Sequence, residues 1–330
     1  MNKSNKLVIS LLVVAIVAGV FIFEKIHNGG GNVTQKVIAI ATLQTHPILD
    51  AVQKGVIDEL TSDGYANGFG ARYILLNAEG NMGQVAAIAD EVAARNPDVV
   101  VAISTPVAQA IVKKFKGEIV FGALTDPVGA GVVDSLDGSN PKVTGTTDAI
   151  PYGEQLKLIR RINPNAKRLG LLFNPGEASS QFAVKIIEEI APTLGFEVVE
   201  GPVNSTSEEY RVALGLVGRV DVLLISTDNT VAAGIAGAIK AGIENEIPVF
   251  ACDSGSVEKG AIGAVSAGYY EIGRETGKLV VKVLHGEHSL PVIQPESGQI
   301  YLNKQAAELM HDILPPDVVT NATKVFAEIK

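Results

Sequence analysis

The segment Asp98-Val-Val-Val-Ala-Ile-Ser-Thr-Pro106 contains the pattern on which the fold interpretation rests. The apolar run 98–103 is followed at once by Ser104, Thr105 and a proline, and an amphipathic segment then continues to Phe115. A run that is apolar on both faces is typical of a buried parallel strand. Proline suits the first turn of a helix, because its missing N–H leaves no hydrogen bond unmade there. The segment therefore predicts a strand followed by a helix.

The same alternation of short apolar runs and longer amphipathic segments extends over residues 36–330. Strands are predicted at Val37–Leu43, Arg72–Leu76, Asp98–Ile103, Ile119–Leu124, Val143–Thr146, Arg168–Phe173, Glu197–Val203, Val220–Ser226, Pro248–Cys252 and Ala261–Val265. Helices are predicted at Pro47–Thr61, Gly83–Arg95, Pro106–Phe115, Gly153–Ile162, Ser179–Leu194, Ser207–Val217, Thr230–Ile243 and Tyr270–Leu284. Short loops between them indicate βαβ units with helices on both faces of each sheet.

The series of strands starts again after Ile150-Pro151, with comparable numbers of strands on either side. One open sheet holding all of them is unusual. The predicted fold class is therefore α/β, with two doubly wound, Rossmann-like lobes joined by a hinge. Such sheets bind ligands beyond the carboxyl ends of their strands, so a cleft between the two lobes is the expected site.

Three strand ends in the first half share one pattern, a polar pair followed by proline: Thr45-His46-Pro47, Ser104-Thr105-Pro106 and Thr125-Asp126-Pro127. Each offers backbone N–H groups at a helix start beside small polar side chains. Any one of them alone is an ordinary capped turn. Three on one sheet edge favour an anion, and the absence of Arg and Lys from these motifs suits a carboxylate better than a phosphate.

Strand ends in the second half carry acidic residues instead. Asn174 opens one such loop, Thr227-Asp228-Asn229 a second, and Asp253 lies in a third. Either aspartate also fits a helix N-cap, and Asp253 is the stronger ligand candidate. A carboxylate-binding lobe that faces an acidic lobe matches a zwitterion such as an amino acid. The candidate ligand-binding residues are Thr45, His46, Ser104, Thr105, Thr125, Asp126, Asn174, Thr227, Asp228, Asn229 and Asp253.

Six ordered motifs closely resemble the ABC-transporter substrate-binding proteins of the tryptophan/tyrosine-uptake type. They are Leu43–Pro47, Ile103–Ala110, Leu124–Gly131, Asn174–Ser179, Ser226–Val231 and Tyr269–Arg274. The resemblance covers about residues 36–310. It implies a type 1 periplasmic-binding-protein fold, three crossover strands, ligands that are often aromatic amino acids, and ABC permease subunits with a cytoplasmic ATPase as partners. Phe121, Phe173 and Tyr269 are candidate aromatic residues of the pocket, with a core or hinge role favoured for each.

The N-terminus predicts export. Lys3 and Lys6 precede an apolar run, Leu7–Phe23, and a glycine-rich stretch, Asn28–Asn32, follows. This pattern is typical of a signal or a short membrane anchor. Val20 stands where a lipoprotein would carry its cysteine. We expect an uncleaved tether that holds the protein outside the cytoplasm, or a released protein if the segment is cleaved.

These features divide the chain into residues 1–35 as anchor and linker, 36–148 plus 268–290 as the first lobe, and 149–267 plus 291–330 as the second. Closure of the lobes about the hinge is the expected binding mechanism. A tethered sensor that signals to a partner fits the same sequence, and a two-lobe enzyme is the weaker alternative.

Other classes of protein lack support in the sequence. The net charge of −9, without a cluster of Lys or Arg, argues against a nucleic-acid partner. A P-loop, a dinucleotide-binding glycine motif, a nucleophile elbow and metal-site spacing of the five histidines are all absent from the sequence. Cys252 is the sole cysteine, so an intramolecular disulfide is excluded and a small buried apolar role is expected. We therefore predict no catalytic residue, no cofactor and no metal.

Overall fold

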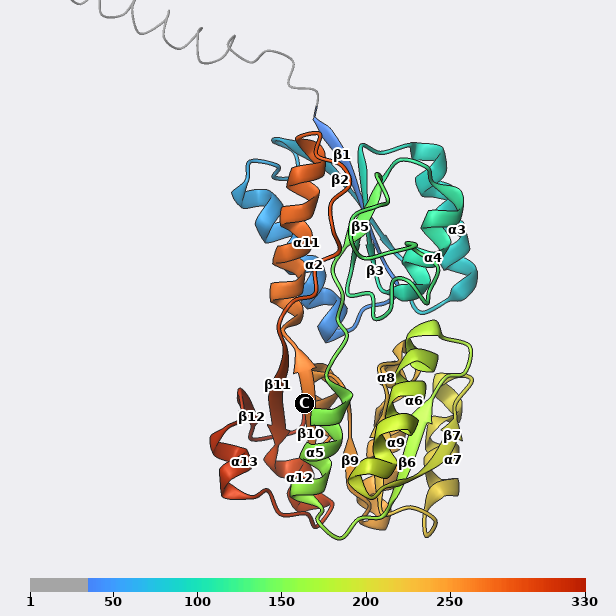
Figure 1. Cartoon of the computed structure of the whole chain (residues 1–330), viewed down its shortest axis with the longest axis vertical. Coiled ribbons are helices and arrows are strands. Elements are labelled where there is room, and N and C mark those ends of the chain that lie inside the picture. Colours follow the sequence, from blue (N-terminus) through green and yellow to red (C-terminus); the bar gives the residue numbers. More distant parts are fainter. Residues whose placement is uncertain (1–34) are drawn as a thin grey trace, which may run out of the picture.

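The computed structural model describes residues 35–330, which form two lobes stacked along the long axis of the molecule (Figure 1). The predicted anchor, Leu7–Phe23, lies outside these residues. Among the helices described, none is both long and apolar enough to cross a membrane.

The first lobe is built on a five-stranded parallel sheet in the order β2-β1-β3-β4-β5. Its strands are β1 (Lys36–Thr42), β2 (Ala71–Asn77), β3 (Val99–Ile103), β4 (Glu118–Gly122) and β5 (Val143–Gly145). Helices α2 (Pro47–Ser62) and α11 (Tyr269–Leu284) lie on one face, and α3 (Met82–Arg95) and α4 (Thr105–Lys114) lie on the other (Figure 1). Because helices cover both faces, the central strand β3 is buried along its whole length.

The second lobe contains a four-stranded parallel sheet in the order β7-β6-β8-β9. Its strands are β6 (Arg168–Phe173), β7 (Glu197–Pro202), β8 (Val222–Ile225) and β9 (Val249–Phe250). Its helices are α5 (Tyr152–Ile162), α6 (Ala178–Ile190), α7 (Glu209–Leu216), α8 (Asn229–Gly234), α9 (Ala236–Asn245) and α10 (Ser254–Glu258), with the short 3₁₀ helices η1 (Ala191–Leu194) and η2 (Thr206–Glu208).

A further set of strands extends this lobe: β10 (Gly263–Ala267), β11 (Ser297–Asn303) and β12 (Lys324–Phe326), with helices α12 (Lys304–Leu309) and α13 (Pro316–Thr320). Backbone hydrogen bonds from Ala251 to Gly263 (3.1 Å) and from Ile262 to Val249 (2.7 Å) join β10 to the neighbourhood of β9. Strand β11 runs antiparallel to β10 and parallel to β12.

The chain passes between the two lobes along three segments. The first follows β5, the second joins β10 to α11, and the third joins α11 to β11. The first and third lie side by side, and the backbone N–H of Thr147 donates to the carbonyl of Ile293 between them at 3.0 Å. Two separate hydrophobic cores result, one on each side of these segments.

The predicted fold class, α/β with two doubly wound lobes, is confirmed, and each predicted strand has a counterpart in the structure. Strands β11 and β12 are missing from the prediction, and the helix predicted at Thr230–Ile243 is divided into α8 and α9 after Gly234. An added Cβ at Gly234 would overlap the carboxyl group of Glu209, so the break lies where a buried side chain fills the space beside the helix. The exact lobe boundaries stay a prediction.

Helices α2 and α11 lie side by side at very short range. A Cβ added at Gly55 would overlap the carbonyl oxygen of Tyr270 and lie 2.8 Å from the backbone nitrogen of Arg274. A Cβ at Gly273 would overlap the carbonyl oxygen of Val52. The contact between the two helices therefore depends on residues that have no side chain.

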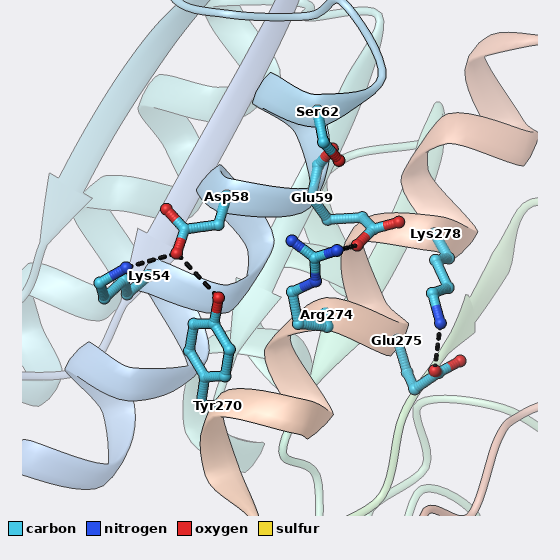
Figure 2. A network of polar contacts seen from close by, with 8 residues as sticks. All are labelled: Lys54, Asp58, Glu59, Ser62, Tyr270, Arg274, Glu275 and Lys278. Carbon is cyan, nitrogen blue, oxygen red and sulfur yellow. Dashed lines mark hydrogen bonds and ion pairs between the residues drawn. The ribbon is translucent and has the colours of Figure 1, made fainter.

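Polar side chains bridge the rim of this contact (Figure 2). Arg274 pairs with Glu59 at 2.6 Å, and the Tyr270 hydroxyl donates to Asp58 at 2.9 Å. Because α2 begins directly after His46 and α11 begins at Tyr269, the packing of these two helices positions two residues that face the cleft.

Candidate ligand-binding site

A cavity lies where the carboxyl ends of strands from the two lobes face each other. The cavity is tight in this closed arrangement, with about 30 Å³ open to the centre of a water-sized sphere. The first lobe and its crossing segments line it with Gln44, His46, Ile48, Leu49, Ser104, Thr105, Ala123, Thr125, Asp148 and Tyr269. The second lobe lines it with Ser179, Thr227, Asp228, Asn229, Ala232, Cys252 and Asp253. Strand-end loops of both sheets thus form one site, as doubly wound sheets generally do.

Eight of the residues predicted from sequence line this cavity: His46, Ser104, Thr105, Thr125, Thr227, Asp228, Asn229 and Asp253. Three others lie outside it. Thr45 is exposed and its hydroxyl accepts a hydrogen bond from Asn77 at 3.0 Å, while Asp126 accepts from the backbone N–H of Gly129 at 2.9 Å and closes its own turn. Asn174 donates to the hydroxyl of Thr230 at 2.8 Å, in a separate groove.

Asp148 is a lining residue that was not predicted. It follows β5 on the first crossing segment, and its carboxyl group accepts hydrogen bonds from Thr125 at 2.8 Å and from Tyr269 at 3.4 Å. The sequence Thr146-Thr147-Asp148 repeats the hydroxyl–aspartate pattern of Thr227-Asp228, and this likeness is the signal that could have identified it. Gln44 and Ser179 lie within two of the motifs that carry the family resemblance, Leu43–Pro47 and Asn174–Ser179, but neither was predicted as a ligand-binding residue.

Tyr269 is the one of the three named aromatic residues that lines the cavity, whereas Phe121 and Phe173 lie in the two hydrophobic cores. Cys252 also reaches the cavity wall and is 1% exposed, and burial raises the pKa of its thiol, so it remains an uncharged apolar group there. The walls formed by Ile48, Leu49 and Ala232 are apolar as well.

The cavity is acidic. Asp148, Asp228 and Asp253 line it, and Lys and Arg are absent from its lining as far as the described residues go. Burial raises the pKa of Asp148, and burial together with nearby Glu177 raises the pKa of Asp228 to about 7. Burial lowers the pKa of His46, although Asp253 opposes the effect. A cationic group in the cavity would favour the ionised form of these carboxyl groups.

Both second-lobe aspartates cap helices. Asp228 accepts hydrogen bonds from the backbone N–H groups of Val231, at 2.8 Å, and Asn174, so it also ties the start of α8 to the end of β6. Asp253 accepts from the backbone N–H of Ser256 at 2.7 Å, at the start of α10. Capping fixes each carboxyl group in place, and the carboxylate lone pairs left over can still accept from a ligand.

Several polar atoms of the cavity wall have no hydrogen-bond partner within residues 35–330: the Ser104 hydroxyl, the Ser179 hydroxyl and the His46 Nε2. Leaving a buried polar atom unpaired costs about 1–3 kcal/mol. Ser104 also has a φ of +87°, which non-glycine residues rarely adopt and which also costs about 1–3 kcal/mol. Unpaired donors and strain at one point are typical of a site that a ligand completes.

Glu209 lies beneath this site and is fully buried against α8 and α9, next to Gly234. Its two carboxyl oxygens have no hydrogen-bond partner in the part of the chain that the structure describes. Burial raises its pKa from 4.5 to about 8.

The pH dependence of stability should reflect this group. Between about pH 5 and pH 8 the folded protein holds a proton on Glu209 that the unfolded chain releases, so stability falls as pH rises through this range. Substitution Glu209→Gln should remove that part of the slope and stabilise the protein most at pH 8 and above. Urea unfolding of both proteins at a series of pH values measures the difference. Equal slopes would contradict the assignment.

Comparisons with known proteins agree with a binding site of this kind. The family model described as ABC transporter substrate binding protein matches residues 37–326. A tyrosine-binding protein of Clostridioides difficile is 32% identical over 323 residues, which cover 94% of this chain and 93% of that protein.

Two solved structures are also similar. One is an ABC domain from Streptococcus pneumonia in complex with L-Trp, with a TM-score of 0.85, 29% identity, and coverage of 88% of this chain and 100% of that one. The other is the ligand-free, open structure of a substrate-binding protein with adhesive properties from Clostridium difficile, with a TM-score of 0.68, 34% identity, and coverage of 89% and 100%.

The described residues also contain no group of three or more His, Cys, Asp and Glu side chains arranged to hold a metal ion. The family and these relatives are solute-binding proteins rather than enzymes. Two lobes, a polar cavity between their strand ends and a family match over nearly the whole described chain lead to one conclusion: this chain belongs to the ABC transporter substrate-binding protein family.

Proposed function

We propose that this protein binds an aromatic L-amino acid between its lobes and presents it, in the closed form, to the permease of an ABC importer. Substrate binding outside the cytoplasm is the role of its family. The finer elements, namely the aromatic ligand, the site residues, the permease partner and an N-terminal membrane tether, are our proposal.

The observation that carries the choice of ligand is the division of the cavity into two kinds of polar group. The unpaired hydroxyl of Ser104 and the helix start at Thr105 suit a carboxylate. Asp148 and Asp253 lie in the same cavity and suit an ammonium group. An α-amino acid supplies both groups, and apolar walls beside Tyr269 suit an aromatic side chain.

The arrangement of the lobes supports binding by closure. The Gln44 side chain of the first lobe donates to the carbonyl of Asn229 in the second at 3.1 Å. The similarity to the L-Trp complex is greater than that to the open, ligand-free relative, although the open relative has the higher identity. A ligand that makes better contacts when the lobes are together shifts the population to this form.

Isothermal titration calorimetry with L-tyrosine, L-tryptophan and L-phenylalanine tests the proposal. We expect at least one of the three to bind, with one ligand molecule per protein molecule. Aspartate and glutamate should bind at least 100-fold more weakly, because their side-chain carboxylates would enter a cavity that is already lined by acidic residues. Because the chain contains no tryptophan, the fluorescence of added L-tryptophan gives an independent measurement without a protein background. Failure of all three aromatic amino acids to bind would refute the proposed ligand.

A further inference from the structure

The first turns of helices α4 and α6, one from each lobe, meet across the cleft. The two helices contact each other, and Ala178 at the start of α6 packs against the core of the first lobe. Neither helix has a side chain that caps its N-terminus in the described structure: Ser104 and Glu177 occupy the N-cap positions without making that bond.

The Glu177 side chain bonds to the start of α8 instead of capping α6. Its carboxylate accepts hydrogen bonds from the backbone N–H groups of Asn229 (3.1 Å) and Thr230 (2.9 Å) at the start of α8. The positive end of the α6 dipole is therefore left without a side-chain acceptor, and it faces the positive end of α4. Two such ends repel each other unless an anion lies between them.

Each of the two helix starts carries a buried serine. Ser104 and Ser179 are both 2% exposed, both line the cavity, and both have hydroxyl groups without a partner among residues 35–330. Asp228 of the second lobe does not accept from either serine, since its carboxyl group already accepts from two backbone N–H groups. The two serines, from opposite lobes, are thus available to one acceptor.

We propose that Ser179 and the first turn of α6 bind the carboxylate of the amino acid from the second lobe, opposite Ser104 and α4, so that this single group draws the lobes together. The inference rests on the proposed function and adds to it. The first lobe alone was expected to hold the carboxylate, and in this arrangement both lobes hold it. The carboxylate makes its full set of contacts only when both helix starts reach it. Ligand binding therefore favours the closed form.

Substitution Ser179→Ala tests this role. A hydrogen bond to a charged group contributes about 1.5–3 kcal/mol, so the dissociation constant for the bound aromatic amino acid should rise about 10- to 100-fold. The unliganded variant should unfold at the same temperature as the parent protein or slightly higher, because the lost hydroxyl has no partner there. Ser207→Ala, an exposed serine of the same lobe outside the cavity, is the matched control and should bind as the parent does.

Small-angle X-ray scattering measures closure directly. At saturating ligand we expect the parent and Ser207→Ala to become more compact, and Ser179→Ala to remain partly extended. The double variant Ser104→Ala/Ser179→Ala should lose less binding free energy than the sum of the losses in the two single variants, since both serines act on one carboxylate.

The outcomes separate this inference from the proposed function. If the parent protein binds no aromatic amino acid, the proposed function fails and the inference fails with it. If the parent binds and Ser179→Ala binds equally well, the proposed function stands and the role of Ser179 is overturned. Additive effects of the two serine substitutions would also overturn the shared carboxylate.

Discussion

Substitution Asp253→Asn is expected to weaken binding of the aromatic amino acid about 100- to 4000-fold. Asp253 is 6% exposed and lies in a cavity whose described lining contains no basic residue. Removing one partner of a buried charge pair costs about 3–5 kcal/mol, and each 1.4 kcal/mol is a factor of about ten in affinity. Asparagine keeps the oxygen that accepts from Ser256 at the start of α10, so the fold should survive the change.

The measurement is calorimetry with the amino acid that the parent protein binds, together with thermal unfolding of the unliganded variant. Asp90→Asn is the matched control, because Asp90 lies on the surface of α3, pairs with Lys114 and lies outside the cavity. The control should bind as the parent does. A loss of less than tenfold in Asp253→Asn, with unfolding unchanged, would exclude Asp253 as the main ammonium partner.

Substitution Gly55→Ala is expected to lower the free energy of unfolding of the first lobe by about 3 kcal/mol, the upper end of the cost of overpacking. The added methyl group would overlap the Tyr270 carbonyl and press against the backbone of Gly273 at 2.9 Å. Backbone atoms cannot rotate away as a side chain can, so α2 and α11 must separate. Both helices begin at the cavity, and ligand affinity should therefore fall as well.

Gly215→Ala is the control for this effect. Gly215 also lies in a helix, α7, and nothing lies within 4 Å of an added Cβ there. Alanine at such a position is expected to stabilise the helix by about 0.5–1 kcal/mol. Urea unfolding of both variants gives the comparison. If Gly55→Ala behaves like Gly215→Ala, the close approach of α2 and α11 is not a source of stability.

The sequence predicts most of the secondary structure because local patterns are enough for it. The runs that became β1, β3, β6 and β8 are apolar on both faces, and a covered parallel sheet is the arrangement that buries both. Strands β11 and β12 escaped prediction because they are only partly apolar and gain their partners from distant parts of the chain.

The candidate site was predicted in part for a similar reason. Ser104, Thr105, Asp228 and Asp253 follow buried strands, and parallel sheets bring such positions to one edge. Thr45 and His46 are neighbours with the same local signal, yet one is exposed and the other lines the cavity. The direction of a side chain within a loop depends on the packing around it, which neighbouring residues in the sequence do not reveal.

The sequence by itself determined the two-lobed α/β architecture and the edges at which ligand-binding groups gather, since both follow from apolar periodicity and strand direction. Only the tertiary structure decided that Ser179 and Ser104, from different lobes, line one cavity, that Asp148 joins Thr125 and Tyr269, and that α2 and α11 touch through glycines. These contacts join residues from different lobes or distant segments of the chain. They arise when segments far apart in the sequence pack together, and no local pattern carries that information.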